Sequence, residues 1–277
     1  MKKLLEIEFY KLKHHKLSRV LFTAYFLLLT SISLIVAIKF TIGNITVHLA
    51  EQGIFNFPYI WHFNTYVADV FTFFLAIIVV SMVTNEFRYR TVKQNLIDGL
   101  SKKEFVLSKF YFLVVLSLLA TLFVFLITLI LGYMYSDYTS PGIVFSEVYF
   151  LPAFFMKILG VFSFIMFLGF LFRRSAFSLA FFFIWIIIEA MIYGLFRWKI
   201  FDKKTADILI TFFPYNALKN LLPEPFTRLS AAKQLGNQIG ENFGNFEGIP
   251  VYHFLIVAVW IFVFVYLSYK ILRNTDL

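Results

Sequence analysis

The chain has 277 residues, of which 60% are hydrophobic and only 15% are charged, and its mean hydropathy is +0.80. This composition excludes an ordinary water-soluble globular protein, because so much apolar surface must face lipid. The net charge of +9 does not indicate a nucleic-acid partner, since much of it flanks apolar segments, where Lys and Arg set membrane topology. No cysteine is present, so disulfides and thiolate metal sites are excluded. We expect an all-α membrane protein in which residues 1–277 form one transmembrane domain within the lipid bilayer.

The apolar segments predict six transmembrane helices. A helix needs roughly 20 residues to cross a hydrocarbon core about 30 Å thick, and each segment reaches about that length. The predicted spans are Val20–Ile38, Asn64–Thr84, Phe105–Tyr135, Tyr149–Phe172, Ser175–Phe196 and Val251–Leu272.

Residues 1–19 precede the first span and are basic and imperfectly amphipathic. On a helix, Phe9 and Leu12 share an apolar arc opposite Lys11, whereas Glu8 falls on the wrong side for this pattern. Basic amphipathic helices lie in the membrane interface, so we expect an N-terminal interfacial helix over these residues.

The longest strongly polar run between two apolar segments is residues 85–109, and we call its first part, residues 85–104, the polar connector. Thr91 and Gln94 have the spacing of a capping box, in which the Thr hydroxyl binds a free backbone N–H and the Gln side chain reaches back. A short helix should therefore begin there. Gly99 fits the left-handed position that follows a helix.

Ser101 and Glu104 form a second capping box that opens the next helix, so the polar connector should make a sharp corner. On the short helix, Val92 and Leu96 share one face. That face lies on the membrane surface or presses into another protein; the alternative is a solvated connector with ordinary caps.

The expected outer connections differ in length. Residues 41–63 read as a short outer loop, and residues 197–250 form the largest piece outside the spans. Within the latter, Ile208–Phe213 is apolar but too short to cross, and Pro214 stops it, so we expect short re-entrant helices that dip into the outer leaflet. Glycines near the end of this piece repeat every four residues among polar residues, which favours a flexible loop over a close-packed helix face: Gly236, Gly240 and Gly244.

Basic residues gather at three places that the six spans would put on one side of the membrane. The groups are Lys2, Lys3, Lys11, Lys13, Lys16 and Arg19, then Arg88, Arg90, Lys93, Lys102 and Lys103, then Arg173 and Arg174. The positive-inside rule makes that side cytoplasmic, with both termini. Four basic residues on the expected outside disagree, Arg197, Lys199, Lys203 and Lys204, although their connection of about 50 residues is near the length at which the rule loses force.

Three ionisable residues fall inside predicted spans: Asp69, Lys157 and Glu189. Counted from the inner helix ends at about 1.5 Å per residue, all three lie at a similar level, roughly 22 to 26 Å up. An unpaired charge in a membrane is costly, so our hypothesis is that Lys157 and Glu189 form an ion pair inside the bundle. In the alternative, Lys157 snorkels to the outer headgroups and Asp69 is interfacial.

The sequence carries no enzyme motif that we can identify. The phosphate loop GxxxxGK[ST] and the zinc-protease motif HExxH are absent, and the five histidines are scattered over both expected sides. We therefore expect no catalytic residue, no metal site and no cofactor in this chain.

The layout and the polar connector resemble the ABC-2 type transporter permeases, the transmembrane subunits of bacterial ABC exporters. The resemblance extends to the N-terminal sequence LLEIEFYKLK, the six spans and the long outer piece before the last span. Many members have Gly before the Thr and Pro in the turn, where this chain has Arg90 and Leu100. The matching positions are Glu86, Thr91, Gly99, Ser101, Glu104 and Lys109.

This resemblance implies that the polar connector contains a coupling helix, which docks on a separate ATPase subunit that binds ATP and Mg²⁺. It also implies a second permease half, a copy or a paralogue, and export across the bacterial cytoplasmic membrane. An ion-coupled secondary transporter, with the three intramembrane charges as its ion site, is the alternative. The implied coupling residues are Glu86, Arg90, Thr91, Val92, Lys93, Leu96, Gly99, Ser101 and Glu104.

Overall fold

The computed structural model describes residues 2–37, 40–42, 45–47, 53–229 and 248–275. Within these residues, five helices are long and apolar enough to cross a membrane. They are α3 (Tyr59–Arg88), α5 (Lys102–Tyr135), α7 (Phe150–Phe172), α8 (Ser175–Leu195, prolonged by the π-helical turn η2, Phe196–Ile200) and α12 (Val251–Arg273). The glycines predicted to lie in a flexible loop, Gly236, Gly240 and Gly244, fall outside the described residues.

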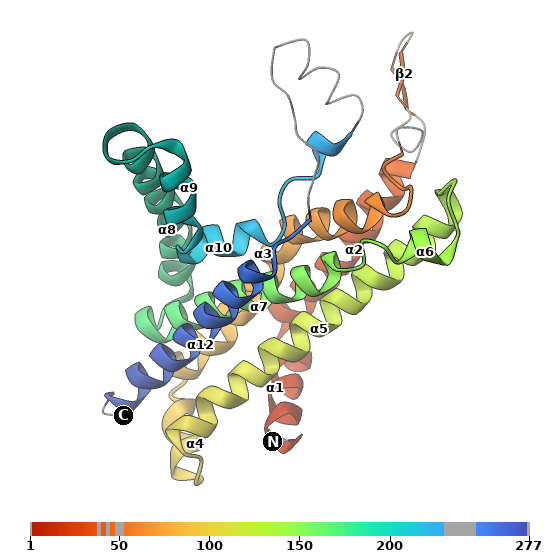
Figure 1. Cartoon of the computed structure of the whole chain (residues 1–277). Helices are drawn as coiled ribbons and strands as arrows, with labels where there is room; N and C mark the ends of the chain where they lie inside the picture. Colours follow the sequence, from red (N-terminus) through yellow and green to blue (C-terminus); the bar gives the residue numbers. More distant parts are fainter. Residues whose placement is uncertain (1, 38–39, 43–44, 48–52, 230–247, 276–277) are drawn as a thin grey trace.

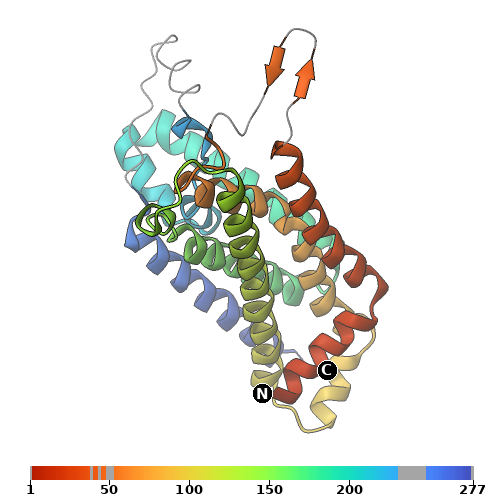
Figure 2. The ribbon, with the colours of Figure 1, turned by 90° about the vertical axis from the view of Figure 1, so that its right-hand side faces the viewer.

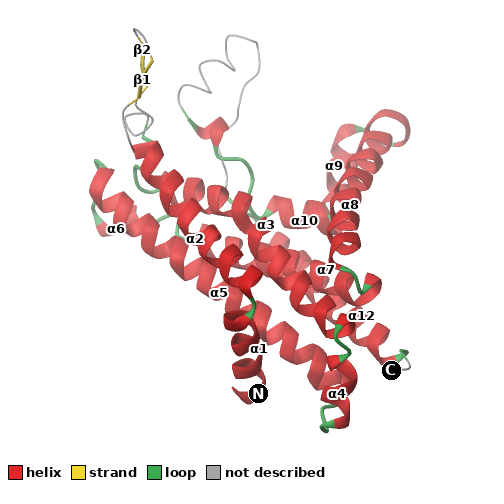
Figure 3. Cartoon of the chain, turned by 180° about the vertical axis from the view of Figure 1, so that it is seen from behind, coloured by secondary structure: helices red, strands yellow, loops and turns green. Residues whose placement is uncertain are grey.

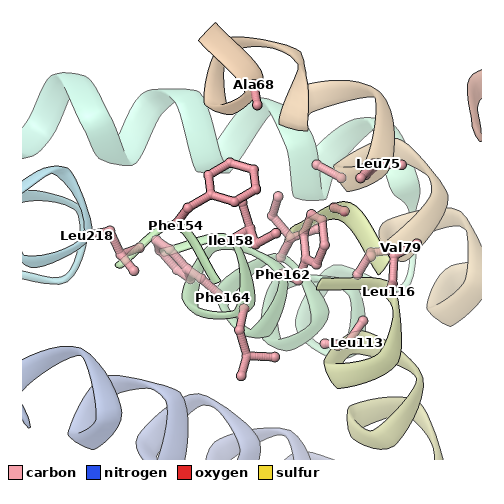
Figure 4. Close-up of a cluster of buried hydrophobic side chains, with 14 of the residues drawn as sticks. Ala68, Leu75, Val79, Leu113, Leu116, Phe154, Ile158, Phe162, Phe164 and Leu218 are labelled. Atoms are coloured by element: carbon pink, nitrogen blue, oxygen red, sulfur yellow. The ribbon is translucent and has the colours of Figure 1, made fainter. Parts of the chain in front are cut away.

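Helix α7 is the centre of the bundle and contacts α3, α5, α8 and α12. Its most apolar stretch is 78% buried, whereas that of α8 is only 11% buried. Phe154, Ile158 and Phe162 of α7 pack among side chains of α3, α5 and α10 (Figure 4). A Cβ atom at Gly160 would lie 2.3 Å from Leu218 Cδ2 of α10, so the glycine permits this close approach. Because lipid removes most of the hydrophobic drive between helices, such tight packing is what holds the bundle together.

The N-terminal interfacial helix predicted for residues 1–19 ends earlier than expected. Helix α1 (Lys2–His14) ends before His15, and α2 (Lys16–Ala37) follows at once. Figure 2 shows the chain changing direction between the two helices. The last residues of the predicted interfacial segment therefore belong to α2.

A sixth span, predicted at Val20–Ile38, is not among the five counted above and stays a prediction. Helix α2 has 22 residues, and at about 1.5 Å per residue it is roughly 33 Å long, enough for a hydrocarbon core. It packs along α3.

Both termini and the polar connector lie at one end of the bundle, which we call the inner end (Figure 1). At the opposite, outer end lie α6 (Pro141–Val144) and an antiparallel hairpin of β1 (Phe40–Ile42) and β2 (Ile45–Val47). The loop predicted for residues 41–63 is shorter than expected, because α3 already begins at Tyr59. The first turn of α3 is buried there: the Trp61 indole donates to the Val144 carbonyl at 2.6 Å.

The long connection before the last span contains the short helices that its sequence predicts. They are α9 (Lys203–Thr211), α10 (Pro214–Asn220) and the 3₁₀ turn η3 (Phe226–Arg228). Asp202 caps α9 by accepting from the side chain and backbone N–H of Thr205, and these bonds hold the pKa of Asp202 below its ordinary value. Helix α10 packs against α7, α8 and α12 (Figure 3). Its entry into the bilayer stays a prediction.

Candidate functional site

The polar connector begins with a different cap from the one predicted. Helix α4 (Thr91–Ile97) follows Arg90, whose φ of 56° is left-handed, and no side chain caps it. The Thr91 hydroxyl donates instead to the backbone carbonyl and the carboxylate of Glu86. The predicted capping box of Thr91 and Gln94 is therefore wrong, because Arg90 is the N-cap residue and Thr91 is already the first residue of the helix.

The second half of the corner is as predicted. Gly99 has a left-handed φ of 99°, and its N–H donates to the Leu96 carbonyl at 3.2 Å, which ends α4. Ser101 and Glu104 make both bonds of their capping box and open α5. Each cap removes a free backbone group, so α4 is fixed at a defined angle to the spans.

The exposed surface of α4 is not the face that its apolar spacing predicts. Val92 is only 1% exposed and Leu96 packs against the core, so neither forms the outer face of the helix. Ile97 is 75% exposed, and Tyr89 and Lys93 are also exposed. The sequence separates the apolar face correctly, but that face packs inward and leaves a mixed apolar and basic surface outside.

Next to the start of α4 lies a cluster of four charges from three helices, three of them buried and Lys11 partly exposed. We call it the basal charge cluster: Glu8, Lys11, Glu86 and Lys109. Lys109 of α5 has no exposed surface, and its Nζ atom lies 2.6 Å from Glu8 Oε1 of α1 and 2.6 Å from Glu86 Oε1 of α3. Lys11 Nζ of α1 also lies 2.6 Å from Glu86 Oε1. Two carboxylates and two ammonium groups give the cluster no net formal charge.

The basal charge cluster joins α1 to the helices on either side of the polar connector. Glu86 is its central member, because the same carboxylate binds Lys109, Lys11 and the Thr91 hydroxyl that opens α4. Burial lowers the pKa of Lys11, but the carboxylates of Glu8 and Glu86 raise it more, so its pKa lies above the ordinary value. Lys11 therefore stays protonated at neutral pH.

Sequence reasoning missed three of these four residues as site residues. Glu8 interrupts the apolar arc of residues 1–19, and this interruption is the available signal: the carboxylate faces inward because it binds Lys109. Lys109 is indicated only by the family resemblance. Lys11 has the pattern of an ordinary basic residue of an interfacial helix.

A basic cavity of about 440 Å³ opens beside the polar connector. Arg88, Arg90 and Lys93 line it from the connector side, and Arg173 lines it from the turn between α7 and α8. The Arg173 guanidinium lies 5.3 Å from the centre of the Phe87 ring, which fixes the turn against α3. The inner end is thus positively charged around α4.

The intramembrane charges pair differently from the hypothesis. Lys157 Nζ of α7 lies 2.8 Å from Asp69 Oδ2 of α3, so the proposed ion pair between Lys157 and Glu189 is wrong. The common level of the three residues does place Lys157 and Asp69 together. Packing sets how each helix is rotated about its own axis, and the rotation of α7 points Lys157 toward α3.

Glu189 of α8 instead binds the start of α10. Its carboxylate accepts from the backbone N–H groups of Tyr215 and Asn216, each at 2.9 Å, and from the Asn216 side chain at 2.8 Å. The Trp185 indole donates to it at 2.6 Å. Because a helix N-terminus presents free N–H groups and a partial positive charge, it satisfies this buried carboxylate without a cation.

A further ion pair, which the sequence did not indicate, fastens residues 223–228 over the outer end of α3. Arg228 binds Glu147 through two nitrogens at 2.9 and 2.6 Å, and its guanidinium lies 5.3 Å from the centre of the Tyr59 ring. The Tyr59 hydroxyl donates to the Pro225 carbonyl at 2.8 Å. The long separation of these residues along the chain hides the contact from sequence patterns.

Five apolar membrane-length helices around α7, with a charged corner fixed at one end, define a multi-pass membrane protein. The family described as ABC-2 family transporter protein matches residues 4–189, from α1 into α8. The chain belongs to this family and is the membrane permease component of an ABC transporter. No curated protein matches its sequence.

Proposed function

We propose that the chain is the permease subunit of an ATP-driven exporter and that α4 is its coupling helix. The observation that carries this proposal is the attachment of α4. Its outer surface is exposed, and Thr91 at its start is bonded to Glu86 of α3. Glu86 in turn binds Lys109 of α5 and Lys11 of α1. A helix held in this way transmits a push from a soluble subunit to two membrane-spanning helices at once.

The ATPase belongs to a separate subunit, because this chain lacks the phosphate loop that binds nucleotide. ATP and Mg²⁺ bind there. The exposed surface of α4 and of the turn before it mixes Tyr89 and Ile97 with Arg90 and Lys93. Such a mixed apolar and basic surface suits a protein interface better than a purely lipid-facing one.

A second permease half, a copy of this chain or a paralogue, completes the transporter. Helix α8 supports this, because it is the least buried of the five membrane-length helices and exposes Phe183, Ile187 and Met191 on its free side. The cargo moves between the two halves. We place the inner end in the cytoplasm of a bacterium, with both termini, following the basic residues gathered there.

An ion-coupled mechanism receives little support from the intramembrane charges. Asp69 and Lys157 neutralise each other, and Glu189 is occupied by the start of α10. A coupling ion would need a carboxylate free to release and rebind it. These charges instead serve to hold α3, α7, α8 and α10 in place.

The coupling assignment is tested by replacing Ile97 and Tyr89 with Asp. Both side chains are exposed, so the double variant is expected to insert and fold normally but to retain at least about tenfold less ATPase on purification, because interface anchors carry most of the binding energy. Ile200→Asp, which changes an exposed isoleucine near the outer end, is the matched control. Undiminished ATPase recovery with the double variant would exclude α4 as the docking element.

A further inference from the structure

A cavity of about 1180 Å³ lies at the outer end, between α8, α9, α10 and α12. We call it the outer cavity. Figure 3 shows α10 between α8 and α12, where Glu189 fixes the start of α10 and therefore one wall of the cavity. A cavity of several hundred cubic ångströms is large enough for a drug-sized molecule.

The walls of the outer cavity are largely apolar and aromatic. Ile186 of α8, Ile208 and Phe212 near α9, and Tyr215 and Tyr252 line it. Ile208 and Phe212 are themselves exposed, so part of the wall is uncovered apolar surface. Such walls bind an alkyl chain or another apolar body by dispersion and by excluding water.

The charged groups around the outer cavity differ in whether they have hydrogen-bond or ion-pair partners. Asp207 accepts from the Tyr193 hydroxyl at 2.6 Å, and Glu224 accepts from the Thr227 hydroxyl at 2.6 Å and from the Phe226 N–H at 2.9 Å. Within the described part of the chain, no ion pair or hydrogen bond engages the ammonium groups of Lys204 and Lys219, although both residues line the cavity. Asp207 and Glu224 keep their negative charges, but each already has a hydrogen-bond donor. The charged groups without a partner among the described residues are therefore the two ammonium groups.

His253 adds an unsatisfied polar atom at the same place. It lines the outer cavity and is only 8% exposed, and its Nδ1 atom is buried with no hydrogen-bond partner among the described residues. A buried polar atom left without a partner costs about 1–3 kcal/mol. In the tautomer that carries its proton on Nδ1, this nitrogen can donate to an anionic oxygen.

We propose that the outer cavity binds an amphipathic anion, a molecule with an alkyl body and a phosphate or carboxylate head. The apolar walls take the body, Lys204 and Lys219 take the head, and His253 supplies one further hydrogen bond. This binding is a property of the chain alone and holds whether or not an ATPase subunit associates, so it goes beyond the proposed transport function.

The test uses the full chain in phosphatidylcholine nanodiscs, with radiolabelled dodecyl phosphate as the probe and equilibrium dialysis as the readout. Empty nanodiscs correct for partition into lipid. Saturable binding is expected, and inorganic phosphate and dodecyl maltoside should compete at least about tenfold more weakly than unlabelled dodecyl phosphate, because each offers half of the recognised chemistry. Equal competition by either compound would overturn the proposal.

Variants locate the site. The pair Lys204→Glu and Lys219→Glu is expected to weaken binding at least about tenfold, because charge-assisted hydrogen bonds to the head are lost. The matched pair Lys199→Glu and Lys203→Glu makes the same charge change on exposed neighbours that do not line the cavity, and it should alter binding by no more than about twofold. Equal losses in the two pairs would reduce the effect to general attraction and refute the site.

Two further arms identify the contributions of the head and of its source. His253→Phe keeps an aromatic ring but removes Nδ1, and it is expected to weaken dodecyl phosphate while leaving dodecyl maltoside unchanged. Phosphatidylglycerol added to the nanodiscs either displaces the probe, which assigns the site to an anionic bilayer lipid, or does not, which assigns it to a soluble amphiphile. Unchanged dodecyl phosphate binding by both His253→Phe and the Lys204→Glu, Lys219→Glu pair would exclude the outer cavity.

Discussion

Lys109 sits within a membrane-length helix with no exposed surface, yet it carries two carboxylate partners. Burying charges costs free energy that an ion pair only partly recovers, so such a cluster is poor evidence for added stability in itself. It does fix one arrangement of its helices, because a shift of α1 by one turn would separate Glu8 from Lys109. We attribute the defined position of α1 under the bundle to this requirement.

Replacing Lys109 with Met keeps the length of the side chain but removes the fully buried cation of the basal charge cluster. Glu8 and Glu86 then keep only Lys11, which is partly exposed. This change is expected to destabilise the protein by about 3–5 kcal/mol, as in other buried pairs that lose one partner, and to lower the melting temperature in detergent. Lys103→Met, on the exposed side of the same helix, is the control. A double variant with Glu8→Gln should lose less than the sum of the single losses, and additive losses would contradict the contact.

The pairing of the intramembrane charges can be tested by exchanging them. Asp69→Lys or Lys157→Asp alone places two like charges together and should reduce the yield of folded protein, whereas the double exchange should restore much of it. The same exchange between Lys157 and Glu189 should not restore the yield of folded protein, because Glu189 accepts hydrogen bonds from the start of α10. Rescue by the second exchange and not the first would contradict the observed geometry.

At the scale of elements, α10 depends on a side chain from a different helix. Pro214 opens α10, and the carboxylate of Glu189 takes the N–H groups of the two following residues. A seven-residue helix is too short to be stable by itself, so this anchor and the packing against α7 and α12 determine that it forms.

Glu189→Gln removes the negative charge but keeps an oxygen acceptor of similar size. We expect faster hydrogen exchange at the amides of Tyr215 and Asn216, by about tenfold, since a charged acceptor at a helix N-terminus contributes roughly 1–2 kcal/mol. Asp207→Asn, at an exposed carboxylate on the neighbouring α9, should leave these two amides unchanged. Unchanged exchange with Glu189→Gln would show that packing alone holds α10.

The sequence predicts those elements whose causes are local. Periodic apolar stretches locate the membrane-length helices, and Ser101 with Glu104 locates the start of α5, because the interacting groups are three residues apart. The predicted cap of α4 is wrong because its cause is not local. Thr91 binds Glu86, and Glu86 is itself positioned by Lys109 and Lys11. That arrangement depends on how α1, α3 and α5 pack.

The same distinction explains the intramembrane charges. Counting residues from the helix ends placed Asp69, Lys157 and Glu189 at one level, and two of them do meet. Choosing the partner requires knowing which way each helix is rotated, which follows from the packing of large side chains around α7. The spacing of residues within a single segment predicts neither that rotation nor the position of α10.

At the scale of the whole molecule, the inner and outer ends of the bundle have different features. The inner end combines both termini, a basic surface and α4, and the outer end combines the fastened segment of residues 223–228 with the outer cavity (Figure 1). The tightly packed α7 connects them. In our account, force from an ATPase enters at α4 and reaches the outer end through α3 and α5, which flank α7.

The most direct test of this account is to identify what α4 touches in the native membrane. The chain contains no cysteine, so Ile97→Cys carries a photoactivatable cross-linker at a single position, and Ile200→Cys does the same near the outer end. The account predicts that position 97 captures a soluble subunit with a phosphate loop, identified by mass spectrometry, and that position 200 does not. Capture of such a subunit from position 200 alone, or from neither position in membranes that contain an active transporter, would contradict it.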